Sequence, residues 1–208
     1  MSEPLALYTN PMSRGRIARW MLEEVGEPYR VEIVDFSAPR DPAFTALNPM
    51  GKVPVLCHGP AVVTEAAAIC AYLADAFPAA GLAPPHGSPE RAAYYRWLFF
   101  AAGPLEAAVT NRALGVAVPP ERRGMVGYGD YGAVLDVLQQ AVGRGPFLLG
   151  ERFTAADLYL GSHLSWGLAF GSIEERPGFA GYVQRVGARP AAIRAQAKDD
   201  AMMPPRPA

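Results

Sequence analysis

The first third of the chain combines two patterns of apolar residues. Short apolar or alternating runs predict four strands, at Leu5–Thr9, Tyr29–Phe36, Val53–Leu56 and Ala61–Thr64. Apolar residues at helical spacing predict helices between and after these strands, at Ser13–Val25, Asp41–Leu47 and Glu65–Phe77. Residues 1–77 therefore form one block in which strands and helices are mixed.

The rest of the chain shows only helical patterns. Residues 78–88 are rich in Pro, Ala and Gly and predict a linker. Helices are predicted beyond it at Pro89–Leu114, Pro119–Val142, Thr154–Phe170, Phe179–Gly187 and Ala191–Lys198. Several glycines weaken the first half of the second of these helices, because each interior Gly costs about 1 kcal/mol relative to Ala. We therefore assign residues 89–208 to an all-helical domain.

Composition narrows the class of protein. Of 208 residues, 50% are hydrophobic, which supports a sizeable core and excludes a disordered chain. Lys and Arg number 19 against 20 Asp and Glu, so the basic surplus that a general nucleic-acid binder needs is absent. We expect no nucleic-acid partner.

The sequence also suggests a compartment. Cys57 and Cys70 are too few for a disulfide framework and have no zinc-binding spacing, and the three histidines are scattered, so we expect no metal site. The first residues carry no secretory signal pattern, and no stretch is apolar enough to span a membrane. These features predict a cytoplasmic protein without a membrane partner.

Three stretches together are similar to the bacterial, cytosolic glutathione S-transferase family. They are the turn and helix from Tyr8 to Glu24, the run Asn48-Pro-Met-Gly-Lys-Val-Pro54 followed by Thr64-Glu65-Ala66, and Phe153-Thr-Ala-Ala-Asp157. The resemblance extends to about Ala197. It implies a thioredoxin-like α+β N-terminal domain and an all-α helical-bundle C-terminal domain that lines a pocket for a hydrophobic electrophile. It also implies glutathione as cosubstrate, no metal, and a homodimer.

A transferase of this kind must ionise a thiol. A free thiol has a pKa of about 8.5, so only about 3% is thiolate at pH 7, and lowering that pKa by two takes about 2.7 kcal/mol. The turn Asn10-Pro-Met-Ser13 lies where thioredoxin-like proteins carry Cys-x-x-Cys, so disulfide exchange through a cysteine is unavailable here. The Asn10 amide, or the hydroxyl or backbone N–H of Ser13, could stabilise the thiolate, with Thr9 and Tyr8 as alternatives. Asn10 and Ser13 equally suit purely structural roles, Asn10 in a turn and Ser13 as a helix cap.

The resemblance assigns the rest of glutathione to two further segments. Val53-Pro54 resembles the family's cis-proline step, where the backbone of Val53 pairs with the cysteinyl part, and Lys52 could bind the glycyl carboxylate. Glu65 could bind the γ-glutamyl ammonium, and the backbone N–H of Ala66, at a helix N-terminus, the γ-glutamyl carboxylate. Many relatives have Ser where this chain has Ala66, so one hydroxyl donor is missing.

Arg14, Arg16 and Arg19 cluster on the first predicted helix. They are interpreted as a solvated face, as ligands of acids across a dimer interface, or as assistants to an anionic ligand. These interpretations stay open at this point.

The expected function is conjugation of the glutathione thiolate to a hydrophobic electrophile. Two alternatives stay open. One is a glutathione-dependent isomerase or lyase, although the Ser-Ser-Cys turn of relatives that act on ring-cleavage products is absent. The other is a non-catalytic ligand- or partner-binding protein on the same fold.

Overall fold

The computed structural model describes residues 4–203, which divide into two compact units. The first unit extends to Ala80 and also includes the segment from Arg189 onward, and the second unit is Gly81–Ala188. The last helix, α9 (Pro190–Asp200), thus groups with the first unit. The sequence had predicted a single helical domain over residues 89–208. The reason for the difference is that charged residues of α9 pair with α1 (Gly15–Val25), as described below.

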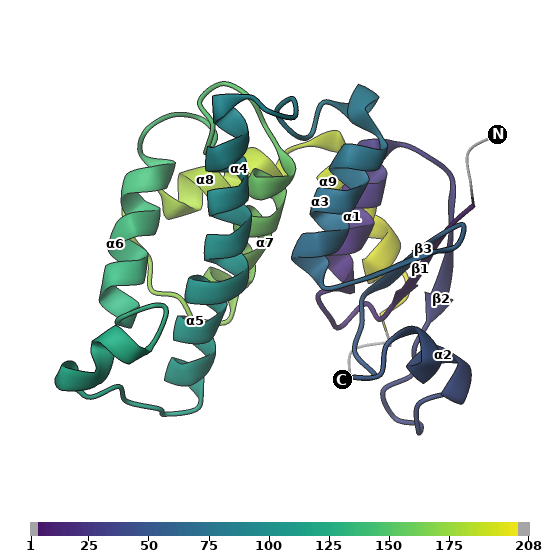
Figure 1. The fold of residues 1–208 in the computed structure, drawn as a ribbon, viewed down its shortest axis with the longest axis horizontal. Coiled ribbons are helices and arrows are strands. Elements are labelled where there is room, and N and C mark those ends of the chain that lie inside the picture. The colour runs from purple at the N-terminus through teal and green to yellow at the C-terminus, as the bar shows by residue number, and fades with distance from the viewer. Residues whose placement is uncertain (1–3, 204–208) are drawn as a thin grey trace. The chain divides into compact units, whose positions relative to one another are not determined.

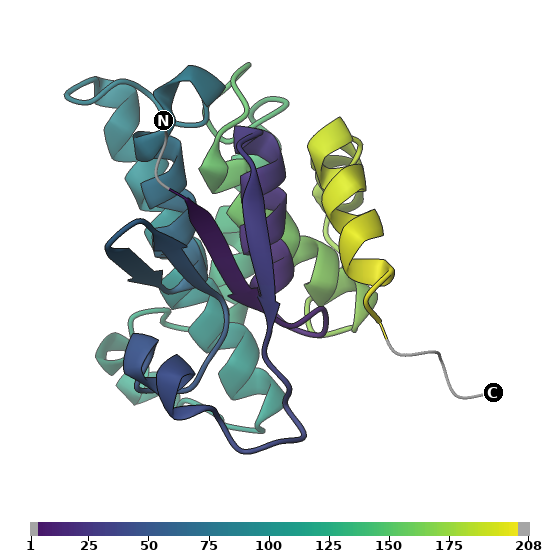
Figure 2. The ribbon, with the colours of Figure 1, turned by 90° about the vertical axis from the view of Figure 1, so that its right-hand side faces the viewer.

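A four-stranded mixed sheet forms the centre of the first unit. Its strands are β1 (Leu5–Thr9), β2 (Tyr29–Ile33), β3 (Val55–His58) and β4 (Ala61–Thr64), in the order β2-β1-β3-β4. β1 and β2 are parallel, as a crossover through α1 allows, and the other two pairs are antiparallel (Figure 2). β2 ends before the predicted Phe36, and β3 begins two residues after the predicted Val53, because Pro54 has no N–H to donate to a neighbouring strand.

Helices α1 and α3 (Ala66–Ala76) cover one face of this sheet (Figures 1 and 2). The core between them is fully buried and consists of apolar side chains that include Leu7, Leu22, Leu56, Ile69 and Leu73. The short helix α2 (Pro42–Leu47) is anchored by Phe44, whose ring centroid lies 5.8 Å from that of Tyr8. A 3₁₀ turn, Pro78–Ala80, ends the first part of this unit.

The second unit is entirely helical apart from two isolated β-bridges. It contains α4 (Pro89–Phe100), a π-helical segment (Ala101–Leu105), α5 (Glu106–Ala113), a 3₁₀ segment (Pro120–Met125), α6 (Tyr131–Val142), α7 (Ala155–Ala169) and α8 (Phe179–Gly187). The predicted helix over 119–142 is correct only for its second half, because glycines and prolines fill the first. The predicted helix over 89–114 stays helical but widens to a π turn at Pro104, which has no N–H to donate.

Candidate active site

The register of the sheet brings the predicted glutathione residues together. Tyr8 of β1 pairs with Val55 of β3, and Val55 pairs with Thr64 of β4. The turn that follows β1, the segment Lys52–Pro54 that precedes β3, and the Glu65–Ala66 step that follows β4 therefore leave the sheet at the same end. Segments more than 50 residues apart in sequence (Asn10 to Glu65) become neighbours because antiparallel pairing places the end of one strand beside the beginning of the next.

The side chains of Asn10 and Ser13 hold the turn between β1 and α1. The Asn10 amide Nδ2 donates to the Val34 carbonyl at 2.9 Å, and its Oδ1 accepts from the Met12 N–H at 2.9 Å. The Ser13 hydroxyl donates to the Asn10 carbonyl at 2.6 Å and accepts from the Gly15 N–H at 3.0 Å. The Ser13 side chain thus satisfies the first N–H of α1 while it closes the turn.

These bonds limit which groups could reach a thiolate. The Ser13 hydroxyl proton and one of the two Asn10 amide protons are already donated to carbonyl oxygens. The hydrogen bonds described for this turn leave the Ser13 N–H and the second Asn10 amide proton unused. The alternative Thr9 is fully buried and its Oγ1 has no partner within residues 4–203, so it faces the interior.

The loop before β3 is shaped by Asn48, whose role no local sequence pattern marks. Asn48 is buried; its Nδ2 donates to the Lys52 carbonyl at 2.9 Å and its Oδ1 accepts from the Met50 N–H at 3.1 Å. The Val53–Pro54 peptide bond is cis, as the resemblance implied. The Lys52 side chain is exposed, which leaves its ammonium group available to an anion.

Arg40 supports the same loop from the segment after β2. Its Nε donates to the Gly51 carbonyl at 3.1 Å and its Nη1 to the Asp35 carbonyl at 2.7 Å, while its guanidinium lies 5.0 Å from the Phe36 ring centroid. The sequence offered no signal for this role, because an Arg in a loop is usually solvated.

Glu65 and Ala66 form the third segment. Glu65 has φ 67°, in the left-handed region that a residue other than Gly or Asn rarely adopts, and its side chain is exposed. It is the residue before α3, and α3 begins without a side-chain cap. The first N–H groups of α3, beginning with Ala66, therefore present a positive helix end with unsatisfied donors. A strained residue beside an open helix N-terminus is typical of a ligand-binding position.

Two of the three arginines in the basic cluster, Arg16 and Arg19, lie on α1 and pair with acids of the same chain. Arg19 is buried and its Nε donates to Asp199 of α9 at 2.8 Å, and Arg16 Nη1 donates to Asp200 at 2.8 Å. For these two residues, intramolecular pairing takes the place of the solvated face that was one of the three interpretations of the sequence. The two cysteines are unpaired, and burial raises the pKa of both thiols, so neither is primed as a nucleophile.

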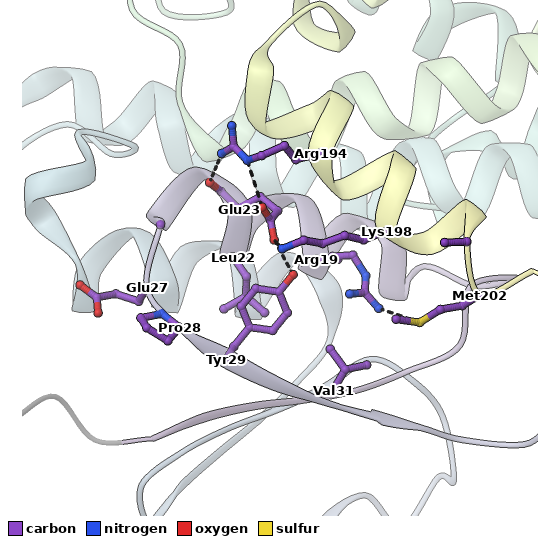
Figure 3. Close-up of a pocket in the computed structure, with 12 residues that line it drawn as sticks. Arg19, Leu22, Glu23, Glu27, Pro28, Tyr29, Val31, Arg194, Lys198 and Met202 are labelled. Atoms are coloured by element: carbon purple, nitrogen blue, oxygen red, sulfur yellow. Dashed lines mark hydrogen bonds and ion pairs between the residues drawn. The ribbon is translucent and has the colours of Figure 1, made fainter.

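A cavity of about 680 Å³ lies elsewhere in the first unit, among α1, β2 and α9 (Figure 3). The Glu23 carboxylate at its wall accepts hydrogen bonds from the Tyr29 hydroxyl at 2.6 Å, from Lys198 at 2.5 Å and from Arg194 at 3.2 Å. Burial raises the pKa of Glu23, but these three bonds outweigh burial and hold it below its ordinary value. The lining includes none of the predicted glutathione residues.

Two further properties concern residues 4–203. Within this range, no three His, Cys, Asp or Glu side chains form a group that could hold a metal ion. No helix in the same range has both the length and the apolar character that crossing a membrane requires.

Comparison with known proteins decides the family. The glutathione S-transferase N-terminal domain matches residues 3–75, and the glutathione S-transferase C-terminal domain matches residues 127–185. The chain is 31% identical over 165 residues to glutathione S-transferase 3 of Zea mays, which covers 74% of each protein. The chain belongs to the glutathione S-transferase family. Its fold is accordingly a thioredoxin-like domain followed by a helical domain, as predicted.

Other members of the family extend the match. Glutathione S-transferase GstA of Escherichia coli O157:H7 is 29% identical over 191 residues, covering 89% of this chain and 94% of that protein. The solved structure of a sphingomonad glutathione S-transferase complexed with glutathione superposes with a TM-score of 0.75 at 27% identity, covering 94% of this chain and 98% of that one. The glutathione S-transferase fold thus accounts for nearly the whole chain.

Proposed function

We propose that the protein is a glutathione transferase that conjugates the glutathione thiolate to a hydrophobic electrophile. The observation that carries the proposal is the convergence of the Asn10–Ser13 turn, the Lys52–Pro54 segment and the Glu65–Ala66 step at one end of the sheet. Membership of the family and the glutathione bound to the sphingomonad relative support it.

Glutathione would be held mainly by backbone groups and charges. The backbone of Val53, beside cis-Pro54, pairs with the cysteinyl part in the manner of an added strand. Glu65 binds the γ-glutamyl ammonium and the N–H of Ala66 binds the γ-glutamyl carboxylate. The exposed Lys52 pairs with the glycyl carboxylate. Each contact anchors one charged or polar end of the tripeptide and directs its thiol toward the turn after β1.

The turn would then ionise that thiol. The Ser13 N–H and the free proton of the Asn10 amide donate to the sulfur at the positive N-terminal end of α1 and favour its anionic form. The thiol proton passes to solvent. The thiolate forms a bond to the electrophilic carbon, and the leaving group departs with the bonding electron pair. Holding both reactants in one orientation supplies a further part of the rate.

A non-catalytic glutathione-binding protein is the second candidate. It is favoured by one observation: both side chains at the thiol position already donate to carbonyl oxygens of the protein, Asn10 to Val34 and Ser13 to Asn10. The two candidates differ in whether the bound thiol is ionised at neutral pH. An isomerase or lyase would share the ionised thiol and would be separated by the product it releases.

Calorimetric titration of glutathione, combined with ultraviolet absorbance of the bound thiolate between about pH 5 and 9, tests the proposal. We expect a bound thiol pKa well below the free value of about 8.5. Asn10→Ala and Ser13→Ala should raise that pKa, whereas Ser13→Thr, which keeps the hydroxyl, should preserve it. Glu65→Gln is the matched control for binding: it should weaken glutathione affinity about 10- to 150-fold without moving the thiol pKa.

Each failure has its own meaning. Absence of binding at millimolar glutathione would reject the transferase. Binding with an unshifted thiol pKa would support the binding protein instead. The proposal also includes a homodimer, which sedimentation velocity tests, and a reducing cytoplasmic location, consistent with two unpaired cysteines.

A further inference from the structure

Helix α9 is joined to α1 largely by charge. Its buried residues are only Ala191, Ala195 and Asp199. The ion pairs that the structure describes between the two segments run antiparallel, and they are Arg16–Asp200, Arg19–Asp199, Glu23–Lys198, Glu23–Arg194 and Glu24–Arg189. The sign of the charge reverses along both segments, from basic to acidic on α1 and from basic to acidic on α9. One antiparallel register therefore satisfies all these pairs.

The pair between Arg19 and Asp199 fixes that register. Each side chain is only 1% exposed, and Arg19 Nε lies 2.8 Å from Asp199 Oδ1. Figure 3 shows Arg19 beneath α9, where it also reaches the sulfur of Met202. Moving α9 along α1 would leave two buried charges unpaired, which is strongly unfavourable. The position of Asp200, the next residue, is thereby fixed relative to α1.

Arg16 connects the end of α9 to the candidate active site. Its Nη1 donates to Asp200 Oδ1 at 2.8 Å, and its Nε donates to the carbonyl oxygen of Pro11 at 2.5 Å. Pro11 is buried within the turn between Asn10 and Ser13. Because the guanidinium is planar, fixing one nitrogen on Asp200 directs the other at the carbonyl. One side chain thus joins the last residue of α9 to the thiol-binding turn.

We propose that Arg16 is a positioning residue for the thiol-binding turn and that Asp200 of α9 orients it. The carbonyls of Asn10 and Pro11 are held by the Ser13 hydroxyl and by Arg16, respectively. With both carbonyls fixed, the Ser13 N–H stays directed toward the position of the glutathione sulfur. Loss of the Arg16 bond frees the peptide between Pro11 and Met12 and lets that donor turn away from the sulfur. This inference rests on the proposed function for its kinetic consequence.

A direct effect of the Arg16 charge on the thiolate is the competing explanation, and it predicts the opposite sign. Asp200→Ala removes the acid that neutralises Arg16, so a charge effect would lower the pKa of the bound thiol. Positioning predicts that the same variant raises it. Asp200→Asn separates the two further: it keeps an acceptor for Arg16, so positioning predicts wild-type behaviour, whereas a charge effect predicts the same lowering as in Asp200→Ala.

The experiment compares Arg16→Met, Arg16→Lys, Asp200→Ala and Asp200→Asn with Arg194→Met as matched control. Arg194 also joins α9 to α1, but the hydrogen bonds described for it go to Glu23 and not to the turn. The measurements are the pKa of glutathione bound to each full-length variant, kcat and KM with a chromogenic aryl halide, and amide hydrogen exchange at Met12 and Gly15 without ligand.

We expect Arg16→Met and Asp200→Ala to raise the thiol pKa by about one, which lowers the thiolate fraction and kcat at pH 6.5 about five- to tenfold. KM for glutathione should change less than about threefold, because the contacts that hold the tripeptide lie on other segments. Arg16→Lys keeps the charge without the planar fork and should behave like Arg16→Met. Exchange at Met12 and Gly15 should accelerate in these three variants but not in Arg194→Met or Asp200→Asn.

The proposal is overturned if Asp200→Ala lowers the thiol pKa, if Arg16→Lys matches the wild type, or if exchange at the turn is unchanged in Arg16→Met. Failure of the proposed function would look different. In that case the wild-type protein would not lower the thiol pKa at all, while hydrogen exchange in the ligand-free protein would still test whether Arg16 holds the turn. A circular dichroism spectrum of each variant confirms that it is folded.

Discussion

The substitution Gly15→Ala tests the packing at the start of α1, where two physical effects oppose each other. Gly15 is buried at the first helical position, so helix propensity alone predicts a gain of up to about 1 kcal/mol for Ala. A Cβ at this position, however, would lie 1.8 Å from Thr9 Oγ1 and 2.9 Å from Thr9 Cβ. Rotation of the Thr9 side chain relieves the first contact but not the second, so the backbone must move.

Overpacking of this kind costs about 1–3 kcal/mol. Two contacts this short put the cost at the upper end of that range, so we expect a net loss of about 2 kcal/mol. For a chain of this size, this corresponds to a fall in Tm of about 4–8 °C. The loss should be accompanied by a higher thiol pKa of bound glutathione, because Gly15 donates to the Ser13 hydroxyl that closes the turn.

Urea denaturation of four proteins measures the effect: wild type, Gly15→Ala, Thr9→Ala and the double variant. Thr9→Ala removes the Oγ1 atom, so Gly15→Ala should cost about 1 kcal/mol less in that background. Gly181→Ala in α8 is the matched control, because nothing lies within 4 Å of its Cβ position and helix propensity should stabilise it. An unchanged or increased stability of Gly15→Ala, or equal costs in both backgrounds, would refute the packing argument.

Three further predictions concern stability. Asp157 is buried and accepts from two backbone N–H groups and from the Tyr182 hydroxyl, so Asp157→Ala should cost about 3 kcal/mol in urea denaturation, and a cost below about 1 kcal/mol would contradict this. Glu65→Gly relieves the φ of 67° and should be about 1 kcal/mol more stable than Glu65→Gln, although both weaken glutathione binding; equal stability would show that Glu65 is unstrained. The pKa of Glu23 is lower in the folded protein than its ordinary value of 4.5. The Glu23 carboxylate therefore stabilises the folded state fully above pH 4.5, and this contribution is lost as the pH falls through the lowered pKa. The stability difference between wild type and Glu23→Gln should therefore be large at pH 7 and shrink below about pH 4.5, and a difference independent of pH would contradict the hydrogen-bond explanation.

Local patterns predicted most elements of the first unit correctly. Two strands have the predicted ends, Leu5–Thr9 and Ala61–Thr64. Two helices, those that end at Val25 and Leu47, begin within two residues of the predicted start. The large error falls at 119–130, where prolines and several glycines outweigh the helical spacing of the apolar residues. A π turn at Pro104 was equally unpredictable, because it depends on how the helix accommodates a carbonyl oxygen that loses its donor where Pro104 has no N–H.

The candidate site was predictable as far as it is encoded in short motifs. The cis Val53–Pro54 bond follows from the family resemblance, and Glu65 and Ala66 lie before and at the beginning of α3 as expected. The supporting residues Arg16, Arg40 and Asn48 were not predictable in these roles. Each acts on a backbone carbonyl, and no local pattern of residue types marks a hydrogen bond to a backbone group.

The sequence by itself determined where the strands, helices and turns of the first unit lie, because propensity, capping and apolar spacing act over a few residues. Tertiary structure decided which ends of those elements meet, and therefore that the segments of Ser13, Val53 and Glu65 lie at one end of the sheet. It also decided that α9 leaves the helical unit to pair with α1. That pairing depends on opposite charges that match only in one register, and the residues that match are more than 160 positions apart in the chain, as Arg189 is from Glu24.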